Sequence, residues 1–348
     1  MFFASDNSGP ALPQVIAALA TANEGYTSGY GAEAGMERVR TALRDVFEAP
    51  EAEVFLVTTG TAANSLALAT LTQPWETIFC STTAHIHEDE CNAPEFFTGG
   101  TKLTLAGTDD KMTPHALRAA IEGEETRGVH GPQRGPVSIT QVTERGQIYS
   151  LDELSALAAT AHEFGLKSHL DGARFANALA ALGCSPAEMT WKLGIDALSF
   201  GGTKNGCIGV EAVIFFDPGH AWEFELRRKR GGHLISKHRY LSDQIEAYLA
   251  GGLWLDAARK ANAACARLAA GLRAIPGVRF DYQPEANIIF LSMPRAMHAR
   301  LFAAGAYYYV LAGDVDHGAA EELLPARLVC DWSMTDEGID RFIEIARG

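Results

Sequence analysis

A lysine and an aspartate stand beside turn residues at the ends of two separate apolar segments. Lys204 lies in the small-residue segment Ser199–Gly206, directly after the run Asp196–Leu198. An amine at such a junction of strand and turn loses hydration, which lowers its pKa and makes it a nucleophile toward a carbonyl carbon. Asp171 lies 33 residues earlier, at the end of the apolar segment Leu166–Leu170. A lysine that bonds the aldehyde of pyridoxal 5'-phosphate and a carboxylate that pairs with its pyridine nitrogen are what this cofactor requires, so the pair predicts it.

The segment Thr58–Asn64 is a candidate seat for the phosphate of that cofactor. It follows the apolar stretch Glu53–Val57 and precedes an apolar helical pattern. Free amides at a helix N-terminus bind anions, and Gly60 lets the backbone approach closely, with Thr61 beside it. Ordinary N-capping explains the same residue types. A helix N-terminus stabilises a charge by roughly 0.3–1 kcal/mol, whereas micromolar binding needs roughly 8 kcal/mol. A covalent bond, a carboxylate and a cation must therefore supply the rest.

A histidine and a basic run are two further candidates for cofactor contacts. His85 follows the apolar stretch Thr77–Cys80, which brings it to the sheet edge where open α/β sheets bind ligands, and its ring could stack on a planar cofactor. A structural hydrogen bond is the commoner role of a single histidine. No metal site is expected, because His85–Glu90 is not a strand and its two histidine rings would then point in different directions. The basic run Arg227–Arg230 precedes two glycines, so Arg230 belongs either to a solvated helix end or to a phosphate clamp.

Apolar segments alternate with helical patterns through the first two thirds of the chain. This alternation predicts an α/β domain with a mainly parallel sheet between helices. The predicted strands are residues 53–57, 77–80, 102–105, 137–142, 166–170, 197–200 and 212–216, and the clearest helices are 62–71, 151–164 and 173–182.

The pattern changes after residue 239. A long helical stretch, residues 243–275, is interrupted at Gly251–Gly252 and ends before Pro276–Gly277. Shorter strands at 278–280, 288–291, 307–311 and 327–329 follow, with helices at 295–304 and from 336 onward. These features predict a small C-terminal α+β domain. We therefore expect a large cofactor-binding domain of residues 1–242 and a small domain of residues 243–348.

The composition limits the partners of the chain. Its formal charge of -14 argues against a broad nucleic-acid surface. No apolar run approaches the roughly 18 residues that a membrane span needs, and the N-terminus lacks a signal-peptide pattern, so a cytoplasmic location is expected. The six cysteines are widely scattered, which indicates neither a zinc site nor a disulfide framework.

With these motifs in place, the chain resembles the L-threonine aldolases of the low-specificity type and, more broadly, the aspartate-aminotransferase-like (fold type I) pyridoxal phosphate enzymes. The matching segments follow the family's order across nearly the whole chain. They are Ser5–Asn7, Tyr30–Gly31, Gly60–Asn64, Ala84–His85, Asp171–Arg174, Thr203–Gly206 and Ala326–Val329.

The resemblance implies how these residues would hold the cofactor. Lys204 would bond it, and Asp171 would keep its ring nitrogen protonated so that the ring accepts electrons. Gly60 and Thr61 would bind the phosphate. His85 would stack on the ring and assist proton transfer.

The resemblance also implies a substrate site and an oligomer. Arg327 would be the main anchor of an amino acid carboxylate, because a guanidinium matches a carboxylate bidentately. Arg174 and Ser5 would assist it, Arg174 also supporting the cofactor. Tyr30 would reach the active site of a neighbouring subunit, so a homodimer or homotetramer with shared sites is expected.

The chain departs from the family at two places. Many threonine aldolases carry Glu-Asn-Thr-His where this chain has Gln141–Glu144. The general base is therefore open between Glu144, His85 and a phosphate-bound water. The family's Met-Arg-Gln is replaced by the segment His233–Lys237, so the phosphate clamp would come from Arg230 or Lys237, of the same or of a neighbouring subunit.

The functional hypothesis is retro-aldol cleavage of L-threonine, L-allo-threonine and related β-hydroxy-α-amino acids to glycine and an aldehyde. A second hypothesis keeps the cofactor and breaks another bond, as a β-eliminating lyase or an aminotransferase does. A third, a non-catalytic cofactor-binding regulator, needs an appended interaction module. The residues before Glu53 already match the enzyme motifs, which argues against that module.

Overall fold

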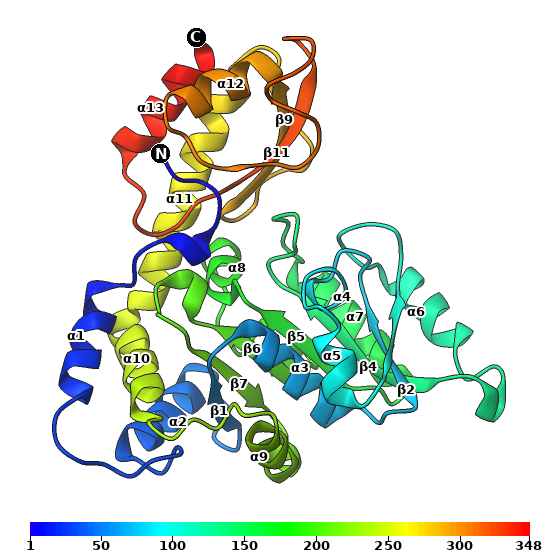
Figure 1. The fold of residues 1–348 in the computed structure, drawn as a ribbon. Coiled ribbons are helices and arrows are strands. Elements are labelled where there is room, and N and C mark those ends of the chain that lie inside the picture. The colour runs from blue at the N-terminus through cyan, green and yellow to red at the C-terminus, as the bar shows by residue number, and fades with distance from the viewer.

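The computed structural model describes residues 1–348, which form two bodies joined by a long helix (Figure 1). The larger body contains a seven-stranded sheet in the order β1-β7-β6-β5-β4-β2-β3. Its strands are β1 (Glu53–Val57), β2 (Glu76–Cys80), β3 (Lys102–Leu105), β4 (Gln133–Thr140), β5 (Ser168–Gly172), β6 (Ala197–Gly201) and β7 (Glu211–Phe215).

The sheet is mainly parallel, as the sequence predicted. Only β7 runs against the others, pairing antiparallel with both β1 and β6. The fifth strand ends later than expected, because Asp171 is paired with Thr140 of β4 and with Ser199 of β6. Asp171 therefore belongs to the strand itself, and its backbone is held on both sides.

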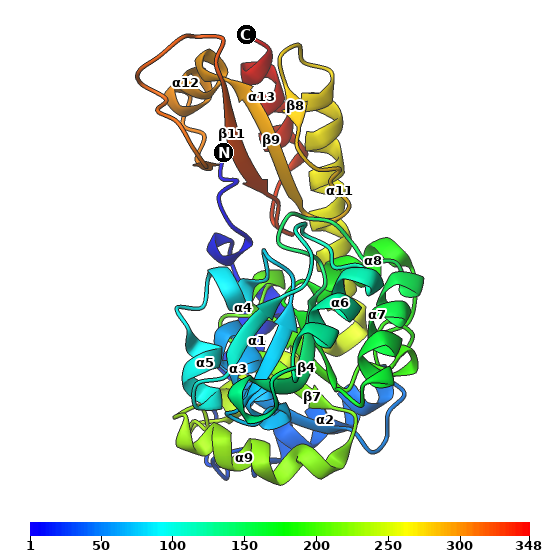
Figure 2. The ribbon, with the colours of Figure 1, turned by 90° about the vertical axis from the view of Figure 1, so that its right-hand side faces the viewer.

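Helices cover both faces of this sheet (Figure 2). Apolar side chains of β1, β6 and β7 pack on one face against α3 and α9, and the larger apolar core fills the other face. The helices of this body are α1 (Pro13–Ala22), α2 (Ala34–Val46), α3 (Gly60–Leu71), α4 (His85–Glu88), α5 (Ala93–Thr98), α6 (Pro114–Gly123), α7 (Leu151–Glu163), α8 (Phe175–Leu182), α9 (Ala221–Arg230) and α10 (Arg239–Leu249).

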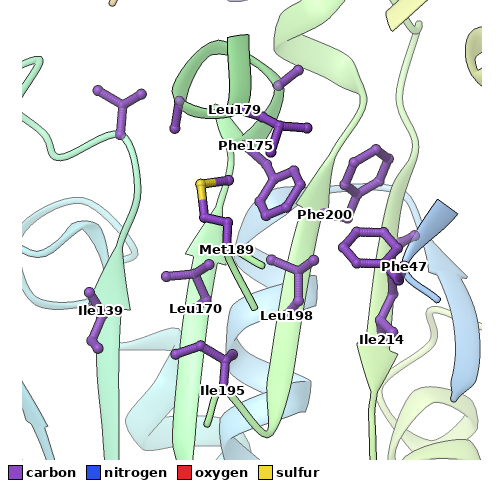
Figure 3. Close-up of a cluster of buried hydrophobic side chains, with 14 of the residues drawn as sticks. Phe47, Ile139, Leu170, Phe175, Leu179, Met189, Ile195, Leu198, Phe200 and Ile214 are labelled. Carbon is purple, nitrogen blue, oxygen red and sulfur yellow. The ribbon is translucent and has the colours of Figure 1, made fainter. Parts of the chain in front are cut away.

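Aromatic packing in the larger core fixes the strand that leads to Lys204 (Figure 3). The ring of Phe200, on β6, lies 5.7 Å from that of Phe175 and 5.9 Å from that of Phe47, measured between centroids. All three side chains are fully buried. The turn that carries Lys204 thus starts from a rigidly packed strand end.

The smaller body is an antiparallel sheet covered by helices. Its strand order is β10-β11-β9-β8. The elements are β8 (Arg279–Phe280), β9 (Ile288–Pro294), β10 (Tyr309–Val310), β11 (Leu323–Val329), α12 (Arg295–Ala303) and α13 (Asp336–Arg347). This α+β arrangement agrees with the predicted second domain.

The long helix α11 (Leu253–Arg273) contributes to the cores of both bodies. Ala257 and Ala258 pack in the large core, whereas residues from Ala264 onward pack in the small one. Phe3 also packs in the small core, although it stands at the N-terminus. The changeover between cores therefore lies within α11, later than the expected boundary at residue 243. No helix of the chain is apolar over a length that would cross a bilayer.

Candidate active site

A cavity of about 270 Å³ opens at the carboxyl ends of the parallel strands. This is the edge at which ligands bind in open α/β sheets. Polar side chains dominate its wall. The lining residues are Asn7, Thr58, Thr59, Gly60, Thr61, Asn64, His85, Thr140, Val142, Glu144, Asp171, Ala173, Arg174, Thr203, Lys204 and Glu211.

The N-terminus of α3 forms one side of the cavity. The Thr59 hydroxyl accepts a hydrogen bond from the Ala62 amide at 3.1 Å and so caps the helix. The amides of Gly60 and Thr61 come before the first intrahelical bond and are left for a ligand. A Cβ on Gly60 would meet no atom of the chain within 4 Å, so the space beside it is open. Thr59 therefore caps the helix, while the amides of Gly60 and Thr61 stay available to an anion.

Lys204 lies on the single turn Thr203–Asn205 that follows β6. Burial and the nearby charge of Arg174 lower the pKa of its amine, although Asp171 and Glu211 act in the opposite direction. A lowered pKa raises the fraction of neutral amine at neutral pH. This is the form that can attack a carbonyl.

The carboxylate of Asp171 is held by two donors. Its Oδ2 accepts from Asn64 Nδ2 at 2.8 Å, and its Oδ1 accepts from the Ala173 amide at 3.0 Å. The side chain is buried, with 3% of its surface exposed. Both bonds hold the carboxylate in one orientation, facing the cavity.

His85 and Glu144 lie together on the wall. The backbone N–H of His85 donates to Glu144 Oε1 at 2.7 Å, while Glu144 Oε2 is buried without a partner. Burial and the nearby charge of Asp171 raise the pKa of Glu144 to about 8. Glu144 is therefore protonated at neutral pH in the absence of ligand.

Glu144→Gln should remove a pH-dependent loss of stability. The folded protein keeps the Glu144 proton up to about pH 8, whereas the unfolded chain releases it near the usual value of 4.5. The tighter binding of this proton by the folded protein adds to the free energy of unfolding. The added stability is fully present below pH 4.5 and is lost as pH rises through 8. Glutamine mimics the neutral acid, so the variant should gain stability relative to the parent between pH 5 and 9.

Denaturant unfolding of the cofactor-free proteins across that range measures the difference. Glu51→Gln, at an exposed position, is the control. Its free energy of unfolding should change with pH in parallel with that of the parent. Parallel curves for Glu144→Gln would contradict a raised pKa at Glu144.

The two arginines expected to bind the substrate lie in different environments. Arg174 lines the cavity, and its Nε and Nη2 donate to the two carboxylate oxygens of Asp6 at 2.7 and 3.0 Å. Arg327, on β11, does not line the cavity. Its Nη2 donates to the Ala4 carbonyl at 3.2 Å, and its buried Nε has no partner. Arg174 is thus committed to an internal ion pair, while Arg327 keeps donors available for a ligand.

Besides Arg327, three residues expected at the site do not line this cavity. Ser5 caps the short helix Asp6–Ser8, accepting from the Asn7 amide at 3.1 Å. Tyr30 is 53% exposed, and its ring lies 5.0 Å from Lys229 Nζ. Arg230 lines a separate groove on α9 together with Phe96 and Phe97. No residue of the run 227–230 lines the cavity of its own chain.

Two polar residues of the wall have roles that the sequence did not predict. Asn64 supports Asp171 from inside α3, where all residues from Ala62 to Thr70 are buried. Glu211 lines the cavity from β7, accepts from the Gly202 amide at 2.7 Å, and has its pKa raised to about 7 by burial. Glu211 is a single acidic residue within an apolar segment, and this interruption was the available signal, whereas Asn64 is followed by Ser65 and offers no such contrast.

The doubly covered, mainly parallel sheet, with a lysine, an aspartate and a helix N-terminus around one cavity, is the framework of the aspartate-aminotransferase-like pyridoxal phosphate enzymes. The Beta-eliminating lyase family model matches residues 3–294. A low specificity L-threonine aldolase of Pseudomonas aeruginosa is 44% identical over 348 residues, covering 99% of this chain and 96% of that protein. The chain therefore belongs to the β-eliminating lyase family and, within it, to the low-specificity L-threonine aldolases.

Solved structures agree with this assignment. A threonine aldolase of Leishmania major superposes with a TM-score of 0.92 at 26% identity, covering 99% of this chain and 98% of that one. A serine palmitoyltransferase of S. paucimobilis with bound PLP shares the fold, with a TM-score of 0.70 at 18% identity over 100% of this chain and 86% of that one.

Proposed function

We propose that this enzyme cleaves L-threonine, L-allo-threonine and related β-hydroxy-α-amino acids to glycine and an aldehyde with the help of pyridoxal 5'-phosphate. The observation that carries the proposal is the convergence of Lys204, Asp171 and His85 on one cavity beside the N-terminus of α3. The near full-length similarity to a named low specificity L-threonine aldolase supports the substrate class.

The residues of the cavity fit the cofactor. The open space beside Gly60 and the unused amides of Gly60 and Thr61 suit a phosphate. Lys204 would bond the cofactor's aldehyde, Asp171 would pair with its ring nitrogen and His85 would lie against its ring. Bound pyridoxal phosphate supplies an electron sink for the pair released when the Cα–Cβ bond breaks.

The substrate carboxylate would be bound by Arg327, with Ser5 beside it. The unpaired Nε and the remaining Nη donors of Arg327 support a bidentate contact with a carboxylate. Arg174 would act through Asp6, holding the N-terminal segment against the cavity. Such contacts fix which bond at Cα is aligned for cleavage.

His85 is favoured over Glu144 as the group that takes the proton of the β-hydroxyl. Glu144 holds its own proton up to about pH 8, so it is a poor acceptor at neutral pH. The imidazole can accept and return a proton in that range. Glu144 would then keep the α4 backbone in place through its bond to the His85 amide.

The active form would be a homodimer or a homotetramer with sites shared between subunits. Tyr30 and Arg230 lie outside the cavity of their own chain, which is consistent with roles in a neighbouring site. The exposed Phe96, at 77%, lies in the same groove as Arg230. A cytoplasmic location stays a prediction from the sequence.

The reaction assigned here predicts its products. The cofactor-loaded protein should release glycine and acetaldehyde in equal amounts from L-threonine and L-allo-threonine, and benzaldehyde from phenylserine. Amino acid analysis and an aldehyde assay measure both products, with cofactor-free protein as the control. Ammonia with a keto acid in place of glycine would identify β-elimination and overturn the proposal.

A further inference from the structure

A buried carboxylate lies behind His85, outside the wall of the cavity. Glu90 Oε1 and His85 Nδ1 are 2.8 Å apart. The Glu90 side chain has no exposed surface, whereas 36% of the His85 side chain is exposed. The imidazole thus bridges a buried acid and the open cavity.

This contact determines where the neutral ring carries its proton. Burial raises the pKa of Glu90 overall, although the hydrogen bonds from His85 and Asn64 act in the opposite direction. Glu90 Oε1 already accepts from the Asn64 amide at 2.9 Å, so this oxygen is placed as an acceptor toward His85 in the ionised acid. A carboxylate only accepts, so Nδ1 of His85 must donate. Nε2 forms no hydrogen bond within the chain and is left with a lone pair.

The same acid is tied to Asp171 through one amide group. Asn64 Nδ2 donates to Glu90 Oε1 at 2.9 Å and to Asp171 Oδ2 at 2.8 Å. Asn64 is 2% exposed and sits inside the buried part of α3. The imidazole and the aspartate that face the cavity are therefore positioned by a single rigid helix.

The charges around the ring favour its protonated form. The ionisable groups around the His85 ring come from four segments: Glu90 after α4, Asp171 of β5, Glu144 after β4 and Lys204 after β6. The hydrogen bond to Glu90 is the largest influence and raises the pKa of His85, with further help from Asp171, against burial and Lys204. Glu88 and Asp89 are exposed to solvent.

We propose that Glu90 is the positioning residue that holds the proton of His85 on Nδ1 and leaves Nε2 to accept the proton of the substrate β-hydroxyl. The proposal rests on the function assigned above. The O–H bond breaks, its proton binds Nε2, and its electron pair becomes the second bond of the aldehyde. The Cα–Cβ pair stays with the glycine fragment, whose Cα finally takes the proton back from Nε2.

Glu90→Gln tests this role because it removes the charge and keeps an acceptor of the same shape. The acid limb of the kcat/KM profile should move to lower pH by about 1 to 2 units, since an adjacent carboxylate raises a histidine pKa by that order. At pH 7, kcat should fall about tenfold to a hundredfold, which is the scale of lost proton-transfer catalysis. KM for threonine should change little, because Glu90 does not touch the cavity. Glu90→Asp, which keeps the charge, should move the limb part of the way back.

The matched control is a second buried pair of the same chemistry. Glu33 Oε1 and His238 Nδ1 are 2.7 Å apart, and both side chains are buried. Glu33→Gln should leave the position of the acid limb unchanged. An equal shift in both variants, or a lower kcat in Glu90→Gln with an unmoved limb, would overturn the proposal.

A second readout does not depend on turnover. Nitrogen NMR of the full-length protein labelled in its histidines reports which ring nitrogen of His85 carries the proton, and His85→Gln identifies the signal. We expect Nδ1–H in the parent and a lower His85 pKa in Glu90→Gln. A dominant Nε2–H form would overturn the proposal even if threonine is cleaved. Nδ1–H without any aldehyde release would instead count against the assigned function alone.

Discussion

Replacing Lys204 with alanine should lower kcat for threonine cleavage by about 10⁴-fold or more, the scale seen when a covalent catalyst is removed. Lys204 is the one lysine that lines the cavity, so no neighbouring amine can take its place. Aldehyde release from saturating threonine measures the loss. Thermal unfolding of the variant should stay close to that of the parent, because removing a partly desolvated amine costs little packing.

Borohydride reduction of the cofactor-loaded parent, followed by peptide mapping, checks the same assignment directly. The label should appear on the peptide that contains Lys204 and be absent from the alanine variant. Lys260→Ala, on an exposed face of α11, is the control and should keep both label and activity. Label on another lysine would disprove the attachment site.

Asp171→Asn should lower kcat/KM by about 10²- to 10³-fold, as expected when one preorganised charge is removed from a site that stabilises developing charge. The neutral amide cannot keep a ring nitrogen protonated. It also places an NH₂ group against either the Asn64 amide or the Ala173 N–H, both of which donate to Asp171. The variant should therefore bind the cofactor more weakly as well.

Steady-state kinetics and a cofactor titration by absorbance separate these two effects. Asp256→Asn, at an exposed ion pair with Arg259, is the control for loss of a surface carboxylate. Near-parental kcat in Asp171→Asn at saturating cofactor would show that the carboxylate does not act on the ring.

The meeting of Lys204, Asp171 and Gly60 could be predicted from sequence because each follows or ends an apolar strand. The carboxyl ends of parallel strands share one edge of a sheet, so their neighbours along the sheet converge. The direction of β7 could not be predicted in the same way. An apolar strand has the same composition in either direction, and only the short return from Lys204 to Glu211 makes it antiparallel.

Contacts between residues far apart in the chain could not be predicted from the sequence. Glu90 follows a short helix in a segment rich in acids and histidines, and nothing in its spacing distinguishes it from the exposed Glu88 and Asp89. Only the fold brings Asn64 beside it. The position of the N-terminal residues could not be predicted either, because Phe3 packs against Phe342 at the far end of the chain.

The helix α11 sets the spacing between the two halves of the substrate site. The lysine that would hold the cofactor belongs to the large body, whereas Arg327 belongs to the sheet of the small body. Because α11 is built into both cores, its length and tilt set the distance between these two groups. A change in α11 could therefore alter which amino acids fit without touching any residue that contacts them.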